Sequence, residues 1–197
     1  MATQIQRSNH TQQQLLAATE QLLAEQGYAA VSEARICELA NLTRGALRHH
    51  YPNGRYDLLP VLIERLIAKQ SQQLEAAQPK NPRERIYLML FSLLEEQAQP
   101  ETVAILEVWM AARGDNKLAE RINPIMNSSI ERLFGMMPGK PIEPDLLALR
   151  CLIHGACMHC FSVDYDPAAL SQAIRWVLEQ LPPPPGFVER LEMAQAA

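Results

Sequence analysis

The sequence has few of the features that mark secreted, disulfide-bonded or membrane-spanning proteins. It contains only four cysteines in 197 residues, and they lie within predicted helices rather than in a secreted disulfide framework. No apolar run approaches the roughly 20 residues that a membrane-spanning helix needs. The polar start, MATQIQRSNH, also lacks the apolar core of a signal peptide. We therefore expect a cytoplasmic protein with no membrane partner.

Aromatic residues are also scarce, at 6% of the chain, and β-branched residues do not alternate as they do in strands. Alanine, leucine, glutamine and glutamate dominate, and most of these residues favour helices. The spacing predicts an all-α protein of about nine helices, long enough for one small and one larger domain. No constellation of acid, base and nucleophile is recognisable, so we expect neither an enzyme nor a cofactor.

Positive charge is too sparse for a nonspecific nucleic-acid binder. The formal net charge is −4, and the first 60 residues hold five basic and five acidic side chains. Three of the five arginines nevertheless fall between positions 44 and 55, beside His49 and His50. Such a local stripe favours DNA binding through a few placed contacts, made by two copies of the chain.

The segment SEARICELANLTRGALRHHYPNGRYDLL, residues 32–59, predicts a helix-turn-helix. Ser32 can cap a first helix that ends near Ala40, and Thr43 can cap a second that ends near His50. Apolar residues recur at helical spacing on both, and such a unit presents its second helix to the major groove of DNA. The residues expected to contact DNA are Thr43, Arg44, Gly45, Arg48, His49, His50, Tyr51 and Arg55.

Two kinds of residue on the second helix support this interpretation. Arg44 and Arg48 lie one turn apart and suit guanine edges or phosphates. Gly45 costs about 1 kcal/mol relative to alanine inside a helix, which makes sense if the backbone approaches another surface closely. The alternative is an ordinary helical hairpin with a solvated charged face.

The order of apolar, glycine, aromatic and basic residues over roughly the first 60 positions resembles the amino-terminal domain of the tetracycline-repressor (TetR) family. The resemblance lies in LLAATEQLLAEQGY (15–28), RICELANLTRGAL (35–47) and HHYPNGRYDLL (49–59). It implies a homodimeric repressor that binds a palindromic operator in double-stranded DNA and is released by a small-molecule effector. An activator or ligand-independent regulator on the same scaffold is the alternative, ahead of a metal or redox sensor or a helical interaction module.

The chain departs from the family pattern at four positions. Cys37 and Asn41 stand where alanine and glycine are usual. Arg48 stands where a tyrosine commonly contacts the phosphate backbone, and Arg55 occupies the position of the usual lysine. Arginine keeps a cationic role at both positions but has a different geometry, which leaves the base preferences open.

The resemblance also implies two domains. Residues 1–55 would bind DNA, and residues 56–197 would bind the ligand and dimerise. The predicted helices 145–163 and 167–181 would form a four-helix interface with the symmetry mate, because they are more apolar than one buried face requires. The alternative is that they pack inside one protomer. The expected interface residues are Leu152, Gly155, Ala156, Ile174, Trp176 and Val177.

An apolar effector pocket is expected in the larger domain. Aromatic and methionine side chains would line it, and an acid and a histidine would supply polar contacts. The alternative is that these side chains simply fill the core. The expected lining is Tyr87, Phe91, Glu107, Trp109, Met110, Met126 and His154.

The run CLIHGACMHC, residues 151–160, places a cysteine or histidine at every third position. Each such step turns the side chain back by about 60° on an α-helix, so the four residues cannot meet one ion. We therefore expect buried small side chains and no metal site. At the other end of the chain, a capping-box signal at Thr11 and Gln14 predicts the start of the first helix, and Gly27 predicts its end.

Overall fold

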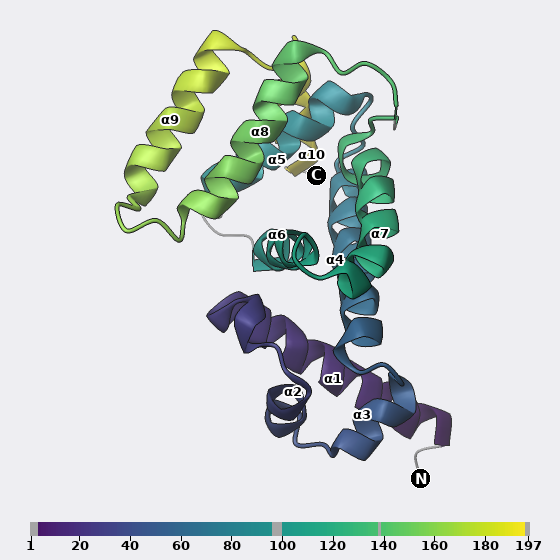
Figure 1. Ribbon diagram of the computed structural model, residues 1–197. Helices are drawn as coiled ribbons and strands as arrows, with labels where there is room; N and C mark the ends of the chain where they lie inside the picture. The colour runs from purple at the N-terminus through teal and green to yellow at the C-terminus, as the bar shows by residue number, and fades with distance from the viewer. Residues whose placement is uncertain (1–3, 96–99, 138, 196–197) are drawn as a thin grey trace. The chain divides into compact units, whose positions relative to one another are not determined.

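The chain folds into helices. The computed structural model describes residues 4–95, 100–137 and 139–195, and over these residues it contains ten α-helices, one 3₁₀ turn and no strand (Figure 1). The all-α prediction is confirmed. One helix more than expected is present because the tail forms a complete helix, α10 (Phe187–Gln195), where the sequence predicts a single turn. None of these described helices is long and apolar enough to cross a membrane.

The helices group into two compact units. The amino-terminal unit comprises Met1–Leu66 and Pro100–Met126, and the carboxy-terminal unit comprises Ile67–Gln99 and Asn127–Ala197. The division predicted at residue 55 concerns function, and it stays a prediction beside this grouping by packing. In chain order the helices before α10 are α1 (Gln4–Gln26), α2 (Glu33–Leu39), α3 (Arg44–His50), α4 (Arg55–Ala76), α5 (Pro82–Glu95), α6 (Pro100–Ala112), α7 (Asn116–Phe134), α8 (Pro144–His159) and α9 (Pro167–Gln180).

The amino-terminal unit has a core made by α1, α2, α3 and α6. Leu15 of α1, Ile36 of α2 and Leu47 of α3 are fully buried. In each helix this residue and its apolar neighbours follow one another at helical spacing, so the helix turns one apolar face inward. Burying an aliphatic side chain of this size stabilises a fold by about 1.5–3 kcal/mol, and these contacts fix the angle at which α3 is held.

The two ends of α1 compare differently with the sequence. The predicted end is confirmed, because Gly27 leaves the helix with a φ of 73° that suits glycine. The predicted start is wrong, because α1 already begins at Gln4. Thr11 lies inside the helix, where its hydroxyl donates to the Arg7 carbonyl at 3.1 Å. A mid-helix threonine commonly makes this bond to the preceding turn, so its side chain need not act as a cap.

In the carboxy-terminal unit, α8 and α9 pack against α5, and α10 follows the proline run. Tyr87 of α5 is fully buried. Its hydroxyl lies 2.8 Å from the Leu181 carbonyl oxygen and 3.1 Å from that of Pro182, to which it donates. Phe187 of α10 is also buried and meets the Tyr87 ring edge-on at 6.5 Å. These contacts tie the end of the chain to α5.

Candidate nucleic-acid interface

Helices α2 and α3 form where the sequence predicts them, and their caps are the predicted ones. The Ser32 hydroxyl accepts the backbone N–H of Arg35 at 3.3 Å, and the Thr43 hydroxyl accepts that of Ala46 at 3.1 Å. Between the helices Asn41 has a φ of 53°, a left-handed conformation that asparagine tolerates better than most residues. Asparagine can therefore serve where the resemblance leads us to expect glycine.

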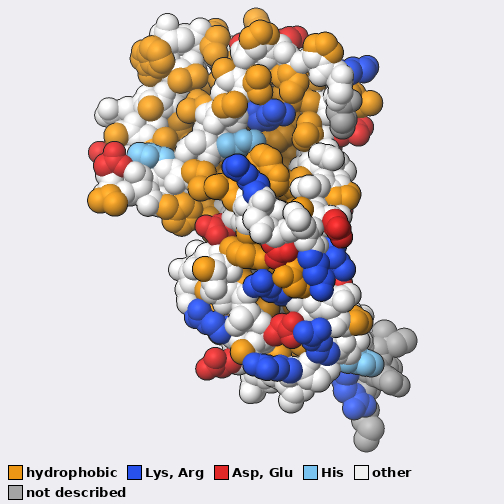
Figure 2. All heavy atoms as spheres, viewed as in Figure 1, with side chains coloured by type: hydrophobic (Ala, Val, Ile, Leu, Met, Phe, Trp, Pro, Cys, Tyr) orange, Lys and Arg blue, Asp and Glu red, His pale blue; other side chains and the backbone are white. Residues whose placement is uncertain are grey.

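The face of α3 that points outward carries most of the residues expected at DNA. Thr43, Arg44, Gly45, Arg48 and His49 are all exposed. Within the described part of the chain, Arg44 makes no hydrogen bond and no ion pair, so its guanidinium is available to an external acceptor. Figure 2 shows basic side chains spread over this unit with acidic ones between them, as the local neutrality of the sequence leads us to expect.

Tyr51 and His50 are less exposed than the residues of this outward face. Tyr51, expected at the DNA surface, is only 5% exposed, and burial raises the pKa of its hydroxyl. It follows Leu47 by one turn, so it continues the inward stripe of α3 and supports the helix from within. His50 is half-buried and meets the ring of His49 edge-on at 5.1 Å.

Arg48 is held by a partner that the sequence does not reveal. Its Nε and Nη2 donate to the two carboxylate oxygens of Glu33 at 3.0 and 2.6 Å, and its Nη1 donates to the Pro52 carbonyl at 2.6 Å. This clasp joins the end of α3 to the start of α2. With the Arg48 side chain 51% exposed, such a pair contributes at most about 1 kcal/mol. The Glu33 carboxylate nevertheless offsets the charge of Arg48, so Arg44 is the cation on α3 that is more available to DNA.

Gly54 lies directly beneath the clasp. It is buried and has a φ of 60°, and a Cβ added there would lie 1.9 Å from Oε1 of Glu33. Glycine is therefore needed both for the backbone conformation and for the space that the carboxylate occupies. The Asn-Gly dipeptide is a turn signal in the sequence, but only the fold shows that its glycine accommodates Glu33.

Arg55 lies in a cluster of tyrosines at the start of α4. Its Nη1 donates to the Val31 carbonyl at 3.2 Å, and its guanidinium lies 5.5 and 5.3 Å from the ring centres of Tyr28 and Tyr56. The hydrogen bond to the Tyr56 hydroxyl, opposed by burial, raises the pKa of Arg55. Tyr56 in turn donates to Asp115 at 2.9 Å. Arg55 thus ties the start of α4 to the segment that follows α1, and it is less available to phosphate than the sequence predicts.

Comparison with known proteins agrees with this arrangement. A model of the tetR family of bacterial regulatory proteins matches residues 15–59, which cover α2, α3, about half of α1 and the start of α4. Over residues 15–59 the chain is therefore similar to the tetR family. It is similar to a helix-turn-helix-type transcriptional regulator of Mycobacterium tuberculosis, with 29% identity over 154 residues that cover 73% of this chain and 75% of that protein.

Solved structures show the same fold. One is a transcriptional regulator from Saccharomonospora viridis in complex with choline, which is 17% identical, has a TM-score of 0.63 and covers 87% of this chain and 96% of its own. Another is the regulator FadR from Bacillus subtilis in complex with stearoyl-CoA, also 17% identical, with a TM-score of 0.56 and coverages of 84% and 96%. The chain thus shares its fold with both of these regulators.

The residues expected to line an effector pocket are divided between the two compact units. The backbone N–H of Tyr28 donates to the Glu107 carboxylate at 2.8 Å, so Glu107 supports the end of α1. Trp109 and Met110 are 41% and 50% exposed on α6. Met126 lies on α7 in the amino-terminal unit.

The other three expected lining residues belong to the carboxy-terminal unit. Tyr87 uses its hydroxyl to hold the proline run. His154 meets the Phe134 ring edge-on at 5.9 Å, and burial, reinforced by Arg150, lowers its pKa. Phe91 alone of the seven residues lines the described cavity between α4, α5, α9 and α10. The effector pocket as a whole stays a prediction.

The residues expected at the dimer interface divide by exposure. Ala156 and Ile174 are buried within the protomer, and so they belong to its core rather than to a surface. Leu152 and Val177 are half-buried. Gly155 is exposed, and Trp176 is 61% exposed. The last two therefore face outward as an interface requires.

The cysteines in and next to α8 differ in burial, because Cys151 is exposed, contrary to the expectation of buried small side chains, whereas Cys157 packs in the core. Cys157 is buried, and burial raises its pKa to about 11, which keeps the thiol protonated. The Cys160 thiol donates to the Cys157 carbonyl at 2.9 Å. Among the described residues no group of three or more His, Cys, Asp or Glu side chains is placed to hold a metal ion.

Gly45 offers a test of close backbone approach. A Cβ added there would meet only the Thr43 hydroxyl, at an ordinary 3.6 Å. Gly45→Ala is therefore expected to keep or raise the free energy of unfolding, by up to about 1 kcal/mol, while weakening DNA binding because the methyl group keeps α3 away from the duplex. Denaturant unfolding and a DNA titration of the same preparation measure the two effects. Unchanged DNA affinity would show that the backbone does not approach the duplex at this point.

Gly54 offers a test of the clasp. Gly54→Ala is expected to lower the free energy of unfolding by about 2–3 kcal/mol, since it adds left-handed strain of about 1–2 kcal/mol and displaces Glu33 from Arg48. Gly139→Ala is the matched control, because Gly139 has a φ of 79° but nothing within 4 Å of the added Cβ. Chemical denaturation of both variants isolates the clash, and equal losses would mean that Glu33 does not fill this space.

Proposed function

We propose that this chain is a non-enzymatic, homodimeric repressor of the TetR family that binds a palindromic operator in double-stranded DNA in the cytoplasm. A small-molecule effector releases it. The observation that carries the proposal is the outward face of α3, where Thr43, Arg44 and Gly45 are exposed side by side and Arg44 is not engaged within the described chain. Phosphate contacts position such a helix and base-edge contacts select the sequence.

Two copies are needed because the helix-turn-helix of one chain, α2 and α3, offers few contacts to DNA. Helix α3 has seven residues. Of the three arginines between positions 44 and 55, two already interact within the chain, one with Glu33 and one with the tyrosine cluster. A dimer doubles the contacts and reads two half-sites about 34 Å apart, one turn of the duplex. The sequence of the operator would then mirror the two-fold symmetry of the protein.

An exposed apolar stripe on α8 and α9 supports dimerisation through this pair of helices. On α8 the exposed residues Leu147, Cys151, Gly155 and Met158 follow one another at intervals of three or four, so they share one face. On α9 Trp176 provides a large apolar surface. Figure 2 shows hydrophobic side chains gathered over the unit that contains these helices. Aromatic residues at the centre of an interface often carry most of its binding energy.

Control by a small molecule is supported by the solved relatives that hold choline and stearoyl-CoA. These two ligands differ in size and charge, so they indicate that this fold can bind small molecules, and they name none for this chain. We expect the effector to bind more tightly to a dimer conformation in which the two α3 helices cannot reach both half-sites. Such an effector would shift the dimers toward that conformation and release them from DNA.

The repressor assignment is tested by measuring reporter expression from the promoter next to the chain's own gene, with and without that gene. Deletion is expected to raise expression, and restoring the Arg44→Ala variant is expected to leave it raised. A fall in expression on deletion would establish an activator on the same scaffold.

A further inference from the structure

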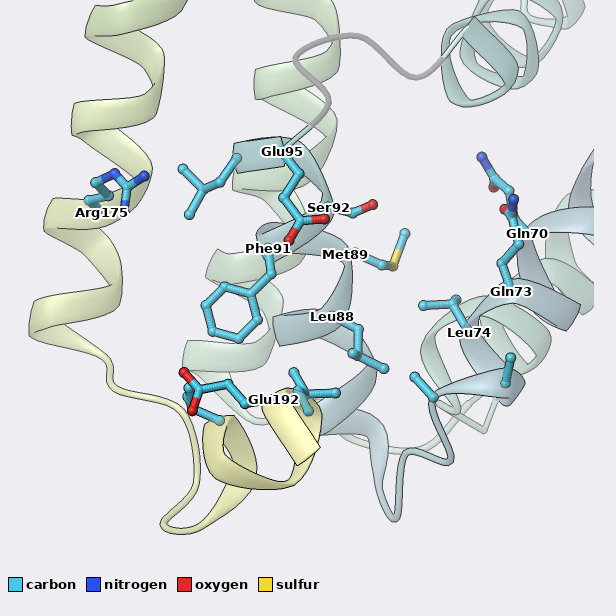
Figure 3. Close-up of a pocket in the computed structure, with 15 residues that line it drawn as sticks. Gln70, Gln73, Leu74, Leu88, Met89, Phe91, Ser92, Glu95, Arg175 and Glu192 are labelled. Carbon is cyan, nitrogen blue, oxygen red and sulfur yellow. The ribbon is translucent and has the colours of Figure 1, made fainter. Parts of the chain in front are cut away.

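A cavity of about 680 Å³ lies in the carboxy-terminal unit, between the far end of α4, the exposed side of α5, α9 and α10 (Figure 3). All its lining residues belong to that one unit. Its volume falls within the roughly 300–1,000 Å³ typical of small-molecule sites. Of the seven residues that the sequence suggests for an effector pocket, only Phe91 is among those that line this cavity, so it is a separate candidate.

The wall contributed by α10 is anchored. Arg190 donates to Oε1 of Glu84 at 2.6 Å, and the other oxygen of Glu84 accepts the Lys80 backbone N–H at 2.9 Å. The Glu84 side chain is only 5% exposed, so losing its cation would leave a buried charge unpaired. Phe187 fixes the Phe91 ring by stacking on it at 6.2 Å with 18° between the ring planes. The cavity therefore has a formed wall and a fixed aromatic surface.

The floor of the cavity is apolar. Leu88, Met89 and Phe91 come from α5, Leu74 comes from α4 and Leu191 comes from α10. Figure 3 shows the side chains of Leu74, Leu88, Met89 and Phe91 around the same space, with Gln70 and Gln73 on the α4 side. A ligand with a hydrocarbon or aromatic body would remove this surface from water, and that burial favours binding.

The charge around this floor is predominantly negative. Glu95 and Glu192 both line the cavity, against one cation, Arg175. Within the described part of the chain, neither carboxylate has a hydrogen-bond or ion-pair partner. Glu95 follows Phe91 by one helical turn, so a carboxylate and an aromatic ring share one face of α5. A carboxylate beside an aromatic face is suited to a positively charged nitrogen.

We propose that this cavity binds an organic cation with an apolar body. The cationic centre lies near Glu95, Glu192 and the Phe91 ring, and the apolar body covers Leu88 and Met89. An anion of the same shape meets two carboxylates for each arginine and is disfavoured. The inference names an effector class for the proposed repressor, and it rests on that proposed function only for its consequence at DNA.

The test compares two ions of nearly equal shape and opposite charge, tetraphenylphosphonium and tetraphenylborate, by calorimetric titration of the full chain without DNA. The cation is expected to bind at least tenfold more tightly. The double variant Glu95→Gln, Glu192→Gln is expected to lose about tenfold to thirtyfold of the affinity for the cation, since each exposed charge contact is worth up to about 1 kcal/mol. The control Glu189→Gln changes a charge on α10 outside the cavity lining and should bind as wild type does.

Equal affinity for the two ions, or cation binding that survives the double variant, would overturn the proposal. Thermal unfolding of the glutamine variants keeps the test interpretable, because loss of binding counts only in a variant that melts as wild type does. If the double variant unfolds at a lower temperature than wild type, the single variants Glu95→Gln and Glu192→Gln replace it. The proposal is then overturned if neither single variant loses affinity for the cation. Because no DNA is present, a failure here leaves operator binding untouched. A cation that binds without weakening operator binding would instead refute only its role as effector.

Discussion

Arg44→Ala is expected to weaken binding to the operator by about 30-fold to 10⁴-fold. The side chain projects from the start of α3 and has no partner within the described chain, so its full hydrogen-bonding capacity is free for DNA. A good contact from arginine to a base is worth about 1–3 kcal/mol, and a dimer makes it twice. Fluorescence anisotropy with the duplex that wild type protects measures the loss.

Arg48→Ala is the informative control for Arg44→Ala. It removes a charge from the same helix, but one already paired with Glu33, so the loss of affinity is expected to be clearly smaller. The salt dependence distinguishes phosphate binding from base recognition, because removing one cation from a phosphate lowers the slope of log affinity against log salt by about 0.9. Binding by Arg44→Ala equal to that of wild type would remove α3 from its role as the reading helix.

Trp176→Arg is expected to convert the dimer to a monomer and to abolish tight operator binding. Trp176 is 61% exposed on α9, and a charge at the centre of an interface is poorly tolerated. An isologous interface contains each residue twice, so a loss of about 2 kcal/mol per copy weakens association by about a thousandfold. Sedimentation equilibrium measures the change from twice 22.2 kDa toward the mass of one chain.

Met193→Arg is the control for this dimer prediction. Met193 is also a large exposed apolar residue, at 74%, but it lies on α10 away from the stripe. It should therefore leave the dimer intact. A Trp176→Arg variant that stays dimeric at micromolar concentration would place the interface elsewhere, and operator binding by a stable monomer would contradict the need for two copies.

The features that the sequence predicts correctly depend on neighbours within one or two helical turns. Ser32 and Thr43 cap the helices that follow them, and Gly27 ends α1, because short-range hydrogen bonds and glycine conformations decide these ends. The prediction at Thr11 is wrong for a related reason. Its capping signal is local, but the polar residues before it extend the helix by seven positions.

The features that the sequence does not predict depend on residues far apart in the chain. Glu33 and Arg48 are 15 positions apart, and Tyr28 and Glu107 are 79 apart. Neither pairing follows from spacing or charge pattern. The cavity in the carboxy-terminal unit needs α10 to fold back on α5, and no periodicity in the sequence indicates that packing. Tertiary packing therefore changes the expected roles of Arg48 and Glu107 without changing the fold class.

The central claim is that two copies of α3 read one palindrome, and a footprint tests it most directly. Purified wild-type protein is titrated onto labelled DNA flanking the chain's own gene, and cleavage of both strands is followed at physiological salt. We expect one protected region with two-fold symmetric sequence, whose half-sites lie about 34 Å apart, and no protection by Arg44→Ala at the same concentrations. Protection of a single asymmetric half-site, or equal protection by the variant, would contradict the account.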